Sequence, residues 1–286
     1  MQFTDAEGKV EVWSGSIQPH DVWLIKGGFR FEVCFNRYYQ PIRKGGVVLV
    51  KFVADIAKKS ELCPIGVVNW RNVNKQVQAD IVELIRGKFI ILDGEIYNDA
   101  MLKHVGKHRR QWKFELKARY FNPTVRTRQQ IENDQSWRNC SRYLARISEI
   151  LKYADNGREA RAMLSHLHTN GSTSFANSRD EFEMEHGREP GGYEFFDRTH
   201  KTKDGVYPEN TNTQELIDMA KSKIDASVAT SSSSKPRIEV EDEVFNKLMY
   251  DKDNSNQKPV GYGFVVKRSD VWECMLYYGK KALLPK

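Results

Sequence analysis

The sequence has little cysteine and no long apolar run, and each absence argues against a class of protein. No stretch approaches the roughly 20 apolar residues that a membrane span needs, so we expect no membrane partner. The N-terminus lacks the basic segment and apolar run of a signal peptide. The 4 cysteines form no Cys-x-x-Cys pair, which favours reduced thiols in an intracellular protein over a disulfide framework or a zinc site. They are Cys34, Cys63, Cys140 and Cys274.

A phosphate-binding glycine motif is also missing. Gly28 and the pair Gly45-Gly46 do not form the G-x-x-x-x-G-K loop that cradles phosphates. We therefore expect no nucleotide cofactor, and no other cofactor is indicated.

Positive charge is present in excess, and it is unevenly distributed. The formal net charge is +7. Residues 101–168 hold 15 Lys/Arg and 6 Asp/Glu, whereas the rest of the chain holds 30 Lys/Arg and 32 Asp/Glu. Because long-range attraction requires charges summed over a patch, a local excess favours a polyanionic partner.

Much of this charge falls on a predicted helix at 98–120. Its apolar residues share one face, so the cations are expected to lie outward, three or four residues apart. Like charges at this spacing repel one another by a few tenths of a kcal/mol per pair, and a polyanion would relieve that repulsion. We therefore predict a surface that binds duplex DNA. Its residues are Lys103, Lys107, Arg109, Arg110, Lys113 and Lys117 on the helix and Arg126 and Arg128 on the loop that follows.

The rest of the chain predicts a mainly α fold. A short strand is expected at 29–35, and a partly flexible, helical region is expected at the C-terminus. Further helices are predicted at 47–56, 74–89, 134–153, 179–185, 214–224 and 237–249. The predicted parts are an N-terminal extension (1–60), a basic helical DNA-binding domain (61–168), a polar motif region (169–225), a flexible linker (226–236) and a C-terminal helix with tail (237–286).

Three blocks resemble the plant Ptta/En/Spm-type transposase family. They are "PIGVVNWRNV" (64–73), "HLHTNGSTSF" (166–175) and "GREPGGYEFFDRTHKTKDGVYPENTNTQELIDM" (187–219). The resemblance extends over roughly residues 30–265. The residues that match family positions are Trp70, Trp112, Trp137, His200, Asp204 and Gly205.

The resemblance implies a transposon-encoded plant protein that acts in the nucleus. The tryptophan-bearing basic helices also resemble the Myb-like and trihelix class of DNA-binding module. In that class, tryptophans pack a small helical core and a basic helix meets the duplex. The resemblance therefore implies a Trp-containing, Myb/trihelix-like helical bundle.

The carboxylates do not form a recognisable nuclease site. Such a site holds two metal ions about 4 Å apart between carboxylates that usually lie on strands and a following helix. The candidates here fall on predicted helices, helix ends or loops. They are Asp80, Asp93, Asp99, Asp134, Asp155, Asp197 and Asp204. We therefore predict no catalytic residue and no metal site.

Two alternatives to DNA binding stay open. In the first, the chain is a protein-interaction module that self-associates through the seam 137–151 and the helices 214–224 and 237–249. In the second, it is a metal-dependent DDE-type transposase that cleaves DNA.

Overall fold

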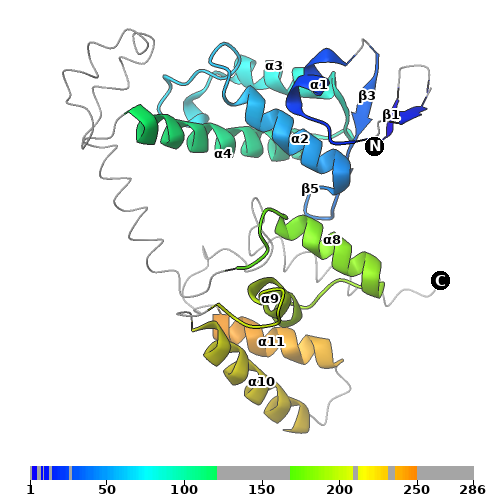
Figure 1. Ribbon diagram of the computed structural model, residues 1–286, viewed down its shortest axis with the longest axis vertical. Helices are drawn as coiled ribbons and strands as arrows, with labels where there is room; N and C mark the ends of the chain where they lie inside the picture. Colours follow the sequence, from blue (N-terminus) through cyan, green and yellow to red (C-terminus); the bar gives the residue numbers. More distant parts are fainter. Residues whose placement is uncertain are drawn as a thin grey trace. The chain divides into compact units, whose positions relative to one another are not determined.

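The computed structural model consists of two compact units, Met1–Glu159 and Ala160–Lys286, and each is described by itself (Figure 1). Helices predominate in both units, which confirms the mainly α fold. Within the described residues, no helix is both long and apolar enough to cross a bilayer. The structure describes residues 2–4, 8, 10–12, 15–25, 28–120, 168–208, 212–230 and 236–249, and side chains in the longest helix as far as Leu116.

A small mixed sheet brings distant segments of the first unit together. Strand β1 (Gln2–Thr4) pairs antiparallel with β2 (Val10–Val12) and with β3 (Arg30–Glu32). Strand β3 pairs parallel with β6 (Phe89–Ile90), so the strand order is β2-β1-β3-β6. Phe89 was expected to end a helix, but it lies in this sheet because its ring packs against another buried phenylalanine of β3.

A separate hairpin follows the sheet strand β3. Its antiparallel strands are β4 (Cys34–Phe35) and β5 (Pro41–Ile42). The strand predicted at 29–35 is therefore two short strands in two different sheets.

The helices of the first unit pack around one core. Helix α2 lies against both α1 and α4, and α3 contacts α4 and β6. Asn74 caps α3, since its side chain accepts a hydrogen bond from the Gln76 N–H at 2.8 Å. The helices are α1 (Pro19–Leu24), α2 (Arg43–Ile56), α3 (Lys75–Arg86) and α4 (Glu95–Tyr120), with a 3₁₀ turn, η1 (Trp70–Asn72), before α3.

Phenylalanine and aliphatic side chains, more than tryptophan, fill this core. Phe31, Phe52 and Phe89 are fully buried, and residues from 17 to 105 contribute to the same cluster. Trp70 and Trp112 are only partly buried, and Trp137 lies outside the described residues. The Trp-centred, Myb/trihelix-like core therefore stays a prediction, as does the finer division of the chain into five parts.

The second unit is helical in its described residues. Helices α9, α10 and α11 pack on one another around Phe196, Ile217 and Phe245. Helix α10 continues through Thr230, so its last residues lie within the segment 226–236 that the sequence analysis predicted to be a linker. The helices are α8 (Phe175–His186), α9 (Gly192–His200), α10 (Thr213–Thr230) and α11 (Arg237–Met249). Residues 226–229 include two alanines, which have a high helix propensity, and this agrees with their place in α10.

Candidate nucleic-acid interface

Helix α4 has a buried side and an exposed basic side. Met101 and Val105 belong to the core, whereas three cations are exposed at spacings of four and three residues. Residues at these spacings are neighbours on a helix surface, so the three cations form one row. Between residues 100 and 114 the chain has five Lys/Arg and no acid. We call Lys103, Lys107 and Arg110 the basic row.

Arg109 and Lys113 do not belong to this row, although the sequence analysis assigned both to the DNA surface. They are only 2% and 6% exposed. The Arg109 guanidinium donates to the Pro64 carbonyl oxygen, with Nη2 at 2.8 Å and Nε at 3.1 Å, and also to the carbonyl of Val67. Lys113 Nζ donates to the carbonyl oxygens of Val67 at 2.6 Å and Val68 at 3.1 Å. Both cations therefore hold the 64–68 loop, and we correct their assignment.

Arg109 and Lys113 turn toward the 64–68 loop because its carbonyls need hydrogen-bond donors. The carbonyls of Pro64, Val67 and Val68 lie in a loop, outside any helix or strand ladder, so their hydrogen-bond donors must come from elsewhere in the protein or from water. A guanidinium and an ammonium on successive turns of α4 supply those donors. No pattern within 98–120 could reveal this, because the acceptors lie more than 40 residues away in the sequence.

The same loop approaches α4 closely at Gly106. A Cβ atom on Gly106 would lie 2.8 Å from Cγ and Cδ1 of Trp70, so the missing side chain leaves room for the indole. The Asn69 side chain caps η1 by accepting from the Asn72 N–H at 3.1 Å. Trp70, which the family resemblance singled out, therefore packs on the middle of the basic helix.

A third side of α4 faces α2 and carries two histidines. The rings of His104 and His108 stack with centroids 6.5 Å apart. Burial, followed by the neighbouring His108 and Lys107, lowers the pKa of His104 to about 4. Burial also lowers the pKa of His108. Next to them, Lys58 Nζ lies 5.5 Å from the ring centroid of Trp112, so this tryptophan contacts the turn that follows α2.

The remaining predicted DNA contacts cannot be placed on this surface. The Lys117 side chain, Arg126 and Arg128 lie outside the residues whose side chains the structure describes. The basic row is therefore the described part of the predicted interface.

In the second unit, the motif residue His200 has a structural environment. It is 5% exposed, its ring stacks on Phe196 at 3.8 Å, and its Nδ1 lies 2.8 Å from the Phe196 carbonyl oxygen. Thr199, beside it, donates from its hydroxyl to the Phe195 carbonyl oxygen at 2.8 Å. Thr199 and His200 therefore contact backbone carbonyls in the last turn of α9.

Asp204 and Gly205 form the turn that follows α9. Gly205 has φ +76°, in the left-handed region that glycine tolerates, and its N–H donates to the Thr202 carbonyl oxygen at 3.0 Å. Asp204 is exposed at this turn. The turn leads to Tyr207, whose hydroxyl donates to the Asp197 carboxylate. Burial, together with Asp197, raises the pKa of Tyr207.

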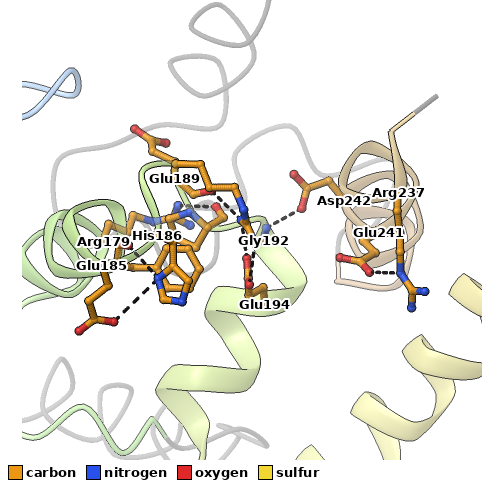
Figure 2. A network of polar contacts seen from close by, with 12 residues as sticks. Arg179, Glu185, His186, Glu189, Gly192, Glu194, Arg237, Glu241 and Asp242 are labelled. Carbon is orange, nitrogen blue, oxygen red and sulfur yellow. Dashed lines mark hydrogen bonds and ion pairs between the residues drawn. The ribbon is translucent and has the colours of Figure 1, made fainter. Parts of the chain in front are cut away.

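The Gly191-Gly192 pair of the same motif lets α11 cap α9. Figure 2 shows Asp242 of α11 reaching the start of α9, where the Gly192 N–H donates to Oδ1 at 2.5 Å. A Cβ atom on Gly191 would lie 3.0 Å from that oxygen and 3.1 Å from Ile238 Cγ1. Burial is the main reason that the pKa of Asp242 is raised. Two ion pairs, Arg188–Glu194 and Arg237–Glu241, belong to the same unit. Figure 2 shows the second pair on α11 beside Asp242.

Among the described residues, no three His, Cys, Asp or Glu side chains are grouped so that they could hold a metal ion. Two of the carboxylates considered from the sequence, Asp134 and Asp155, lie outside these residues.

The block at 187–219 lies within the part of the chain that matches a known protein family. Residues 148–269 match the family model of plant transposases of the Ptta/En/Spm family, which confirms the resemblance seen in the sequence. The matched region begins after α4, so the likeness of residues 64–73 and of α4 to the family stays a prediction. The chain matches no curated protein and no solved structure.

Proposed function

We propose that this chain, which carries a plant transposase domain of the Ptta/En/Spm family at residues 148–269, is a nuclear, transposon-derived protein that docks α4 on duplex DNA. In this proposal it has no catalytic site, metal or cofactor of its own. The observation that carries the proposal is the basic row, three exposed cations on one side of a helix that has no acid between residues 100 and 114.

The geometry of the basic row suits a phosphate backbone. At a rise of about 1.5 Å per residue, Lys103 and Arg110 are about 10 Å apart along the helix axis, with Lys107 between them. Double-stranded DNA carries one charge per roughly 1.7 Å of axis, so several phosphates lie within reach of the row. Such contacts fix the position of the helix but do not read sequence.

The structure reduces the predicted set of phosphate-contacting cations from eight to six. Six to eight neutralised phosphates correspond to a slope of log K against log[salt] of roughly −5 to −7, so six correspond to the shallow end of that range. With Arg109 and Lys113 holding the 64–68 loop, the row supplies three cations. Lys117, Arg126 and Arg128 bring the predicted set to six.

Fluorescence anisotropy with a labelled duplex of random sequence tests the proposal. We compare the full chain with the triple variant Lys103→Ala, Lys107→Ala, Arg110→Ala. The control is Lys221→Ala, Lys223→Ala, Lys247→Ala, which also removes three exposed positive charges, but from the second unit. We expect at least a tenfold loss of affinity for the row variant and less than a twofold change for the control. Equal losses, or no binding by the natural chain, would refute the proposal; circular dichroism verifies that each variant is folded.

The two alternatives predict different results. The first alternative is self-association through the seam 137–151 and the helices α10 and α11. The seam lies outside the described residues, and Ile217 and Phe245, on the two helices, already pack within the second unit. Self-association predicts a tight oligomer in sedimentation experiments that is indifferent to DNA. A DDE-type transposase predicts strand cleavage that depends on Mg²⁺ or Mn²⁺.

A further inference from the structure

The loop that packs on α4 is anchored at successive points. Arg109 and Lys113 donate to the carbonyls of Pro64, Val67 and Val68, and Trp70 occupies the space left by Gly106. Burying two cations is costly unless their donors are satisfied, so this anchoring ties α4 firmly to the loop. The end of the loop is therefore held in one place relative to α4.

The anchored loop ends beside the basic row. Gly106 follows Lys103 by three residues and precedes Arg110 by four, so it neighbours both on the helix surface. Trp70 packs directly on Gly106, and Arg71 is the next residue along the chain. The turn η1 and the basic row therefore belong to one surface of the first unit.

Two exposed polar side chains project from this turn. Arg71 and Asn72 are both exposed, and among the described residues neither side chain has a hydrogen-bond partner. The backbone on either side of them is held, because Gln78 Nε2 donates to the carbonyl oxygens of Trp70 at 3.3 Å and Val73 at 3.1 Å. The turn thus has a fixed backbone and available hydrogen-bonding groups, which is what a preorganised reading element requires.

These residue types are the ones that read base edges in the major groove. Arginine pairs with O6 and N7 of guanine through two donors, and asparagine pairs with N6 and N7 of adenine. The two lysines of the basic row lack this geometry and serve as point charges for phosphates. The surface therefore combines a row that suits backbone contacts with a turn that suits base contacts.

We propose that Arg71 and Asn72 determine the DNA sequence preference of the interface, with Arg71 recognising a guanine and Asn72 an adjacent or nearby adenine. This inference rests on the proposed DNA-binding function of α4.

Selection of bound duplexes from a random pool, with the full natural chain, tests the inference. Affinities for the selected duplex and for its scrambled version are then measured for Arg71→Ala, Arg71→Lys and Asn72→Ala. We expect a selected site with a guanine and an adenine, and a fall of about tenfold or more in the affinity ratio for each variant. Arg71→Lys keeps the charge but loses the two-pronged donor, so its ratio should fall as well.

Two controls separate sequence reading from general binding. The double variant Lys103→Ala, Lys107→Ala should weaken binding to both duplexes by a similar factor. The ratio of its affinities for the selected and scrambled duplexes should therefore stay within about threefold of the ratio for the natural chain. Lys221→Ala with Lys223→Ala, in the second unit, should change neither affinity. Circular dichroism checks the fold of every variant.

The outcomes distinguish this inference from the proposed function. If the natural chain binds no DNA, both fail. If it binds DNA without selecting a site, or if its preference survives the Arg71 and Asn72 substitutions, DNA binding stands and this inference is overturned.

Discussion

At the scale of single residues, the surroundings of a cation decide its role. Arg109 and Arg110 are adjacent in the sequence, yet the first is buried against backbone carbonyls and the second is exposed. Helical periodicity placed Lys103, Lys107 and Arg110 on an outer face, where they are indeed exposed. It could not place Arg109 or Lys113, because the loop carbonyls that bind them belong to a distant segment.

Replacing Arg109 with lysine tests its anchoring role. Lysine keeps the charge but cannot reach the carbonyls of Pro64 and Val67 with a planar fork of donors. We expect the free energy of unfolding to fall by about 1–3 kcal/mol, because the part-buried carbonyls of Pro64 and Val67 lose hydrogen bonds from a charged donor. Urea unfolding measures this, with the exposed Arg110→Lys as the matched control, expected to change stability by less than about 0.5 kcal/mol. Equal stability of the two variants would contradict the anchoring.

His104 should make stability depend on pH. Its folded pKa of about 4 lies below the ordinary value of about 6.5, so below pH 6.5 the unfolded chain binds a proton that the folded chain excludes. Stability from this group is complete above pH 6.5 and is lost as pH falls toward 4, by about 3 kcal/mol in total. Urea unfolding at several pH values should show this dependence reduced in His104→Leu. An unchanged dependence in that variant would show that other groups cause it.

At the scale of elements, local patterns predicted the longer described helices but missed the short helices α1 and α9 and the pairing of the strands. Helices α3, α4 and α11 were predicted from the sequence at 74–89, 98–120 and 237–249. The pairing of β3 with β6 was not predicted, because the strands are separated by more than 50 residues and each is only two or three residues long. Strands this short give no periodic signal, and their pairing depends on burial that forms only in the folded chain.

The contact between α9 and α11 is a second feature that the sequence did not reveal. Asp242 accepts from the Gly192 N–H and so caps a helix to which it is not joined in sequence. Asp242→Ala should lower the free energy of unfolding by about 1–2 kcal/mol. Asp242→Asn should cost less, because the amide oxygen still accepts and burying a neutral group avoids the penalty that raises the pKa of Asp242.

Thermal or urea unfolding of the full chain measures both Asp242 variants. Glu239→Ala, an exposed position on the same helix, is the control and should change stability by no more than about 0.5 kcal/mol. An asparagine variant as unstable as the alanine variant would show that the charge, and not the acceptor oxygen, is required.

At the scale of the whole molecule, the two units differ in charge. Residues 28–120 hold 18 Lys/Arg and 9 Asp/Glu. The described residues between 168 and 249 hold 9 Lys/Arg and 15 Asp/Glu. By net charge alone, a polyanion should be attracted to residues 28–120, which contain the basic row, and repelled by the described part of the region that the family model matches. On this account, DNA binding and the family match belong to different parts of the chain.

The salt dependence of DNA affinity tests the basic row most directly. Affinity for one duplex is measured between about 50 and 200 mM salt for the natural chain and for Lys103→Ala, Lys107→Ala, Arg110→Ala. If each cation neutralises one phosphate, the slope of log K against log[salt] should become shallower by about 2.7 in the variant. Parallel lines for the two proteins would show that these cations release no counterions, and that DNA, if bound at all, is bound elsewhere.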